Sequence, residues 1–106
     1  MKRGEIWTLR GSGYASKARP ALIVQSDDID DFNSRIVAFL SSFDSSDFPS
    51  RILLEPTELN GLRKNSYVMT DKLIAVPKED FGKKIGAIDS KGMEKVSQSI
   101  KAVLGL

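Results

Sequence analysis

An arginine stands where a strand is expected to begin, in the segment Lys17-Ala18-Arg19-Pro20 that precedes the apolar run 21–24. The run predicts a buried strand. An arginine rarely lies fully buried without a partner, because removing water from its charge is costly. Proline fixes φ and removes a ladder donor, which makes the strand entrance rigid. A permanent charge on such a base suits a phosphate or carboxylate, and a structural ion pair is the alternative.

Two hydroxyl groups, those of Ser41 and Ser42, follow a second apolar run over residues 35–40. If both strand ends meet at one rim of a barrel, Arg19 beside a hydroxyl can hold and polarise a phosphodiester. The alternative is that these serines only cap or turn the chain after the strand.

A basic loop with one aromatic residue joins the first two predicted strands and contains Arg10, Tyr14 and Lys17. This composition suits single-stranded nucleic acid, with a base stacked on Tyr14 and phosphates near the cations. An ordinary hairpin loop with Tyr14 packed on the core is an equal alternative.

Asp71 interrupts an apolar segment over residues 66–73, and Lys72 follows it. The carboxylate is expected to face solvent, as alternation along a strand permits, or to pair with a cation such as Arg19. If it were buried, it could serve as a general base.

The 106-residue composition narrows the chemistry further, because the chain contains no cysteine and no histidine. Disulfides, thiolate catalysis, imidazole bases and zinc sites are therefore excluded, and no metal or cofactor is predicted. The lack of cysteine fits a cytoplasmic protein, and no apolar run approaches the ~20 residues that span a bilayer. The formal net charge is only +2, so an RNA partner would need locally clustered cations.

Six short strands and one C-terminal helix are predicted to position these residues. The strands are expected over residues 3–10, 21–25, 35–40, 51–55, 66–73 and 84–88, with helical turns over 26–33 and 77–81. Asp89 or Ser90 caps the helix, Gly105 ends it, and its apolar stripe is Met93, Val96, Ile100, Val103 and Leu104. The expected fold is mainly β with a C-terminal helix: a single domain over residues 1–106 forming a small, mostly antiparallel barrel.

Taken in order, these segments resemble the MazF/PemK family of toxin endoribonucleases from bacterial toxin–antitoxin pairs. The matching pieces are residues 3–7, Arg19-Pro20 with the run to Gln25, residues 37–42, Pro56, residues 61–66, Val68, residues 71–73, residues 85–89 and the helix ending at residue 106. Together they span nearly the whole chain.

The resemblance implies an SH3-like barrel that forms a homodimer and cleaves single-stranded RNA at a short sequence. Cleavage would need no metal and would use the 2′-hydroxyl of the substrate, with Arg19 and Ser41 as the catalytic pair. The family has threonine at the position of Ser41, so the hydroxyl is kept and a methyl group is lost.

Further contacts are predicted around this pair. The predicted RNA-binding residues are Arg10, Tyr14, Lys17, Ser42, Asp71 and Lys72. The predicted protein partner is an antitoxin whose acidic segment covers the RNA groove. The first loop is shorter than in commoner members and lacks their Gly-x-Glu-Gln-Gly run, so the segment 13–17 resembles a short-loop branch.

Two alternatives come from other functional classes. A related toxin family with this barrel poisons DNA gyrase without cutting RNA, and a generic SH3-like module would only bind a protein.

Overall fold

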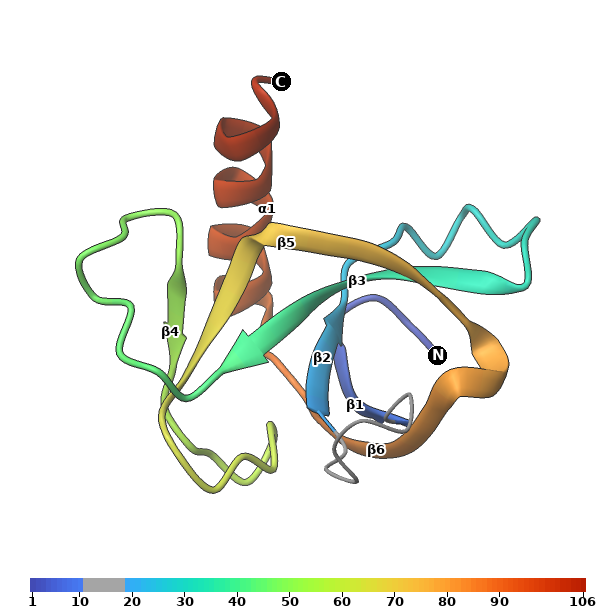
Figure 1. Ribbon diagram of the computed structural model, residues 1–106, viewed down its shortest axis with the longest axis horizontal. Helices are drawn as coiled ribbons and strands as arrows, with labels where there is room; N and C mark the ends of the chain where they lie inside the picture. The colour runs from blue at the N-terminus through green and yellow to red at the C-terminus, as the bar shows by residue number, and fades with distance from the viewer. Residues whose placement is uncertain (11–18) are drawn as a thin grey trace.

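The computed structural model describes residues 1–10 and 19–106, so the predictions for Tyr14 and Lys17 lie outside the described residues. It contains six strands, one 3-10 helix and one α-helix (Figure 1). In chain order these are β1 (Glu5–Leu9), β2 (Arg19–Ile23), β3 (Ser34–Ser41), β4 (Ile52–Leu54), β5 (Ser66–Pro77), η1 (Lys78–Asp80), β6 (Phe81–Ala87) and α1 (Ser90–Leu104).

The strands form one antiparallel sheet in the order β4-β5-β3-β2-β1-β6, which confirms the prediction of a mainly β fold with a C-terminal helix. The sheet curls strongly but does not close, because no described pairing joins the edge strands β4 and β6. The antiparallel sheet of the prediction is therefore confirmed, but its closure into a barrel is not. The sheet stays open because β4 has only 3 residues and pairs with β5 alone among the described strands.

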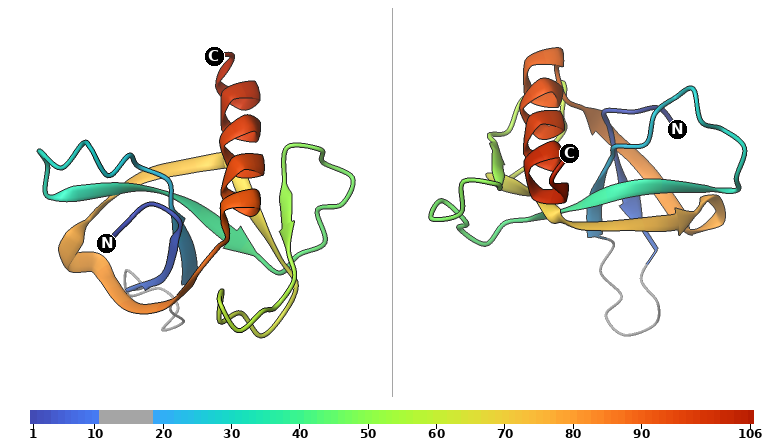
Figure 2. Two further views of the ribbon diagram at one scale, coloured as in Figure 1. Left: turned by 180° about the vertical axis from the view of Figure 1, so that it is seen from behind. Right: turned by 90° about the horizontal axis from the view of Figure 1, so that it is seen from above.

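Both faces of the curled sheet are covered, which explains why the whole run Ala21–Val24 is buried. The cluster inside the curl consists of Leu9, Ala21, Ile23, Val37, Val76 and Phe81. The cluster on the other face consists of Ile6, Leu22, Val24, Ala38, Leu40, Leu54, Val68 and Val96. Figure 2 shows α1 lying against this second side of the sheet.

Helix α1 begins and ends where the sequence predicted. The Asp89 carboxylate accepts a hydrogen bond of 2.7 Å from the Gly92 N–H, and Gly105 adopts the left-handed conformation with φ 72°. Val96 is fully buried, but Val103 and Leu104 are 39% and 55% exposed. The C-terminal part of the predicted apolar stripe is not buried, because the last turns of α1 extend beyond the sheet (Figure 1).

Two further boundaries differ from the predictions. Residues 26–33 form turns and no helix, since the Ser26 hydroxyl accepts from the Asp28 N–H at 3.2 Å and offers a local alternative to helical bonding. Strand β5 continues to Pro77, four residues beyond its predicted end, because its second half pairs with β3 down to Ser34. The turn predicted at 77–81 is η1. No helix in the described part of the chain is long and apolar enough to cross a membrane.

Candidate active site

Arg19 is the first residue of β2 and is exposed, as its place at a strand entrance predicted. It lies opposite Leu9 of β1, and Arg10 follows Leu9 directly. The N–H of Arg10 donates to the Asp80 carbonyl at 2.8 Å, which holds the end of β1 against η1. Two exposed cations therefore stand on fixed backbone at one end of the sheet.

The end of β3 brings Ser41 to the same end of the sheet. The last printed pair of β2 and β3 is Ala21 opposite Phe39, and Arg19 and Ser41 lie two residues beyond it on their strands. Because side chains alternate along a strand, Arg19 shares the face of Ala21 and Ser41 shares the face of Phe39. The two predicted residues therefore lie on one face at this end of the sheet.

Ser41 has a hydroxyl with one fixed contact. Its Oγ accepts a hydrogen bond of 3.1 Å from the Phe43 N–H. A hydroxyl accepts through its lone pairs and donates through its single proton, so this contact leaves the proton available to a ligand.

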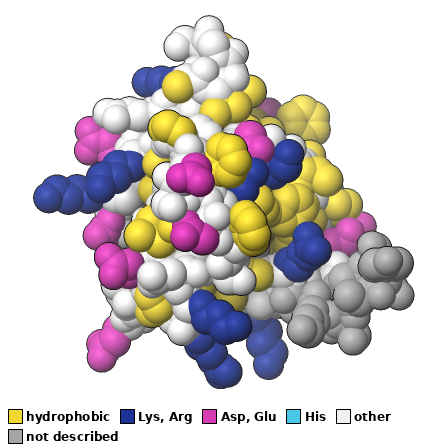
Figure 3. Space-filling model, turned by 60° about the vertical axis from the view of Figure 1, so that its left-hand side comes forward, with side chains coloured by type: hydrophobic (Ala, Val, Ile, Leu, Met, Phe, Trp, Pro, Cys, Tyr) yellow, Lys and Arg dark blue, Asp and Glu magenta, His cyan; other side chains and the backbone are white. Residues whose placement is uncertain are grey.

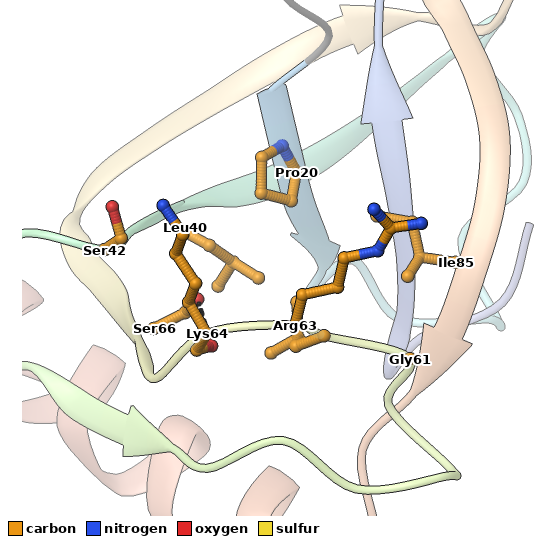
Figure 4. Close-up of a pocket in the computed structure, with 9 residues that line it drawn as sticks. Pro20, Leu40, Ser42, Gly61, Arg63, Lys64, Ser66 and Ile85 are labelled. Carbon is orange, nitrogen blue, oxygen red and sulfur yellow. Dashed lines mark hydrogen bonds between the residues drawn. The ribbon is translucent and has the colours of Figure 1, made fainter.

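A pocket of about 490 Å³ opens on the opposite face at this end of the sheet. Its lining residues are Pro20, Leu40, Ser42, Gly61, Leu62, Arg63, Lys64, Ser66 and Ile85 (Figure 4). Pro20 follows Arg19, and Leu40 and Ser42 flank Ser41, so the pocket lies one residue away from each of the two predicted catalytic residues along the chain. Ser42 is therefore separated from Ser41 by strand alternation.

Arg63 and Lys64 are the polar residues that were missing from the predicted site. Both are exposed, and Figure 4 shows Arg63 reaching toward Ile85 and Lys64 lying beside Leu40. Neither forms a salt bridge with another described residue, and no carboxylate lines the pocket. Their adjacency within the segment 61–66 was the available signal, but only folding showed which strand ends they face.

The wall of this pocket is formed by close packing of the turn 57–61 on β6. The Ala87 N–H donates to the Leu59 carbonyl at 3.0 Å, and a Cβ on Gly86 would lie 2.3 Å from that same oxygen. Gly61 has φ +66°, which favours glycine. These two glycines let the turn carry Arg63 and Lys64 to the pocket.

Asp71 pairs with Arg51 and does not pair with Arg19. The guanidinium binds both carboxylate oxygens, with Nε–Oδ1 and Nη2–Oδ2 distances of 3.1 Å. The hydrogen bonds from Arg51 lower the pKa of Asp71 despite partial burial. Lys72 is 58% exposed at its side chain and contacts the same carboxylate at 3.3 Å. Asp71 is therefore an ion-pair partner and a poor candidate for a general base.

Asp71 and Lys72 lie in an irregularity of β5. Val68 pairs with Leu40 and Leu73 pairs with Ala38, so four residues of β5 lie opposite the single position 39. This bulge takes Asp71 out of the regular pairing with β3.

The segment after Ser41 is held to β5 by side chains. The Tyr67 hydroxyl donates to Asp44 Oδ1 at 3.1 Å, and Ser45 is fully buried. The pKa of Tyr67 is raised, mainly by desolvation and to a smaller extent by the hydrogen bond to Asp44. The Asp44 pKa is lowered, first by the Ser46 backbone and side chain and then by Tyr67.

The whole chain is similar to known toxins. Residues 2–104 match the family model of the PemK-like, MazF-like toxin of type II toxin–antitoxin systems. A probable endoribonuclease MazF of Mycolicibacterium smegmatis is 33% identical over 107 residues, which cover 100% of this chain and 98% of that protein.

Solved structures share the fold. An endoribonuclease in complex with its cognate antitoxin, from a mycobacterial species, superposes with a TM-score of 0.85 at 22% identity and covers 100% of this chain and 96% of that one. The Mycobacterium tuberculosis toxin MazF-mt6 gives 0.80 at 21% identity, with 96% and 97% covered. A MazE–MazF structure from Deinococcus radiodurans gives 0.80 at 16% identity, with 100% and 97% covered.

The match over residues 2–104 confirms the resemblance that was read from the sequence. The name of the relative at 33% identity agrees with the predicted endoribonuclease activity and favours neither a gyrase poison nor a simple binding module. The chain belongs to the family of PemK-like, MazF-like toxins of type II toxin–antitoxin systems.

Proposed function

We propose that this toxin cleaves single-stranded RNA at the sheet end where β2 begins with Arg19 and β3 ends with Ser41. The observation that supports the proposal is that an exposed guanidinium and a hydroxyl with an available proton lie just beyond the last β2–β3 pair, on one face of the sheet. The substrate's 2′-oxygen would attack the adjacent phosphorus while the bond to the 5′-oxygen breaks. Arg19 would stabilise the charge on the pentavalent phosphorus, and Ser41 would donate to a phosphate oxygen.

The cations near this pair would hold the RNA backbone. Arg10 and Arg19 stand at the ends of β1 and β2, and Arg63 and Lys64 stand at the pocket beside them. Ser42 lines that pocket and can donate to a phosphate oxygen. Lys72 adds charge at β5, and Tyr14 and Lys17 remain predictions for the first loop.

Asp71 takes a different role in this proposal from a direct RNA contact. Its oxygens are engaged by Arg51 and Lys72, so it would orient Arg51 and the segment after Ser41. Cleavage would need no metal ion, in keeping with the prediction from the family.

The protein partners follow from the family and stay proposals for this chain. MazF relatives are solved with antitoxins, including the mycobacterial complex and MazE–MazF from Deinococcus radiodurans. A cognate antitoxin with an acidic segment would compete with RNA for the exposed cations. The chain would act as a homodimer with an SH3-like fold in the cytoplasm, where mRNA is available, and unopposed activity would arrest growth.

Cleavage of a mixed RNA pool by wild type, Arg19→Ala and Lys91→Ala tests this function. Lys91 is exposed on α1, does not line the pocket, and serves as the matched charge control. Removing Arg19 is expected to lower the rate about a hundredfold or more, while Lys91→Ala stays near wild type. Circular dichroism checks that each variant is folded. Undiminished cleavage by folded Arg19→Ala would reject the role of Arg19.

RNA cleavage, DNA supercoiling by gyrase and growth together separate the alternatives. A gyrase poison would leave the RNA pool intact and inhibit supercoiling by gyrase, whereas a simple binding module would do neither and would not arrest growth.

A further inference from the structure

Phe43 presents a large apolar ring to solvent immediately beyond the catalytic pair. It lies two residues after Ser41 and is 72% exposed. Its N–H donates to Ser41 Oγ at 3.1 Å, and its carbonyl accepts from Ser45 Oγ at 3.2 Å. Both backbone polar groups are thus fixed while the side chain remains uncovered by the described residues.

The contact that holds Phe43 continues to β5. Ser45 is fully buried, and its Oγ accepts a hydrogen bond of 3.1 Å from Arg51 Nη1. Arg51 in turn donates hydrogen bonds to both carboxylate oxygens of Asp71. We call Ser45, Arg51 and Asp71 the loop clamp. The clamp connects the sheet to the Phe43 carbonyl through buried or half-buried polar groups, so the position of Phe43 is set by β5.

A second aromatic ring strengthens the clamp. The Arg51 guanidinium lies 5.6 Å from the centre of the Phe48 ring, and the Phe48 N–H donates to the Ser45 carbonyl at 2.9 Å. Figure 3, which brings the left-hand side of Figure 1 forward, shows hydrophobic and acidic side chains interspersed on that face of the molecule.

The charges of this loop decide what Phe43 can bind. Asp44 and Asp47 follow the ring in sequence and would repel a phosphate, whereas the face of a nucleobase carries no net charge. Stacking on an aromatic side chain suits every base and needs no cation. A ring held on fixed backbone also loses little conformational entropy on binding.

We propose that Phe43 is a stacking platform for a nucleobase next to the scissile phosphate, and that the loop clamp positions it. The inference rests on the proposed function, because its ligand is the RNA that Arg19 and Ser41 would cleave. Phe43 would contact the substrate directly, and Ser45, Arg51 and Asp71 would be positioning residues.

The test uses an RNA that binds but cannot be cut. Sequencing the ends that wild type produces from a mixed RNA pool identifies a cleaved site. An oligonucleotide of that sequence with a 2′-deoxy nucleotide at the attacking position is then labelled, and its binding is measured by anisotropy over a range of salt concentrations.

Phe43→Ala should weaken binding by roughly 5- to 150-fold, which is the range for the loss of one stacked base. Phe43→Trp should restore it, because the ring is kept. The slope of affinity against salt should not change, since no phosphate contact is lost. Phe32→Ala is the matched control, because Phe32 is 65% exposed in the distant turn over residues 26–33 and should bind as wild type does.

Arg51→Lys tests the clamp, since it keeps the charge but loses the two-pronged contact with Asp71. It should weaken binding and lower kcat together, with an unchanged melting temperature within a few degrees. If this variant bound and cleaved like wild type, the clamp would have no positioning role.

The outcomes separate this inference from the proposed function. Equal binding by Phe43→Ala and Phe32→Ala, with Arg19→Ala still inactive, overturns the platform and leaves the nuclease assignment standing. Wild-type cleavage by Arg19→Ala overturns the catalytic assignment. Phe43→Ala could instead bind RNA as wild type does but alter dimerisation or antitoxin binding. This result would show that the ring contacts protein and would also reject the inference that Phe43 stacks on a nucleobase.

Discussion

At the scale of single residues, the catalytic proposal depends on a hydroxyl at position 41 and a guanidinium at position 19. Neither group has an unusual environment, since both are accessible at the end of the sheet. Their proposed chemistry comes from their positions at the start of β2 and the end of β3, and from the Phe43 N–H, which fixes the Ser41 oxygen as an acceptor.

Replacing Ser41 tests this arrangement. Ser41→Ala removes the donor to the phosphate oxygen and should lower kcat about a hundredfold. Ser41→Thr keeps the hydroxyl and should retain most of the activity. Single-turnover cleavage of a defined RNA measures both. Equal rates for Ser41→Ala and wild type would remove Ser41 from the catalytic pair.

At the scale of elements, the edge strand β6 is held to β1 by charge as well as by backbone bonds. Glu5 of β1 accepts from the Trp7 indole at 2.9 Å and lies 3.1 Å from Lys84 of β6. Burial raises the pKa of Glu5, but hydrogen bonds from the Lys2 backbone, Trp7 and Lys84 outweigh it and lower the pKa to about 2.

This shift predicts a pH-dependent contribution to stability. The folded state favours the charged carboxylate, so the stabilisation is complete above the ordinary value of 4.5 and disappears as the pH falls toward about 2. Glu5→Gln should therefore lower the free energy of unfolding by about 2 kcal/mol at pH 7, with a smaller difference at about pH 3.

Urea unfolding at the two pH values measures the difference. Glu94→Gln, on the exposed surface of α1, is the control and should change stability by less than about 0.5 kcal/mol. A Glu5→Gln penalty that is equal at both pH values would show that the carboxylate charge does not stabilise the fold.

At the scale of the whole molecule, the net charge of +2 is too small to attract RNA without local clustering. The fold supplies that clustering at one end of the sheet, where Arg10 and Arg19 are joined by Arg63 and Lys64 from the β4–β5 connection. The loop clamp borders the same end.

Salt dependence measures the effect of this cluster. If Arg63 and Lys64 each neutralise one phosphate, replacing both with alanine should reduce the slope of log affinity against log salt by about 1.4, because each contact on a single strand contributes ~0.7. The uncleavable RNA serves as the probe, and Lys91→Ala should keep the full slope. An unchanged slope in the double variant would place the RNA away from the pocket.

Much of the architecture was predictable because local patterns specify it. Short apolar runs bounded by glycine, proline and serine identified the strands, and Asp89 and Gly105 identified the helix ends. The failures have tertiary causes. The sheet stays open because β4 is short. Strand β5 is longer than predicted because its second half pairs with β3, and the end of α1 is exposed because it extends beyond the sheet.

For the site, composition limited the available chemistry. With no histidine or cysteine, the remaining polar side chains are arginine, lysine, serine, threonine, tyrosine and the carboxylates, and Arg19-Pro20 and Ser41 are the predicted pair. Long-range strand pairing then set the neighbours of each group. Asp71 pairs with Arg51, Arg63 and Lys64 line a pocket with Pro20 and Ser42, and Phe43 is exposed on a hydrogen-bonded backbone. The reason is that residue type determines what a group can do, whereas long-range strand register and bulges determine its neighbours.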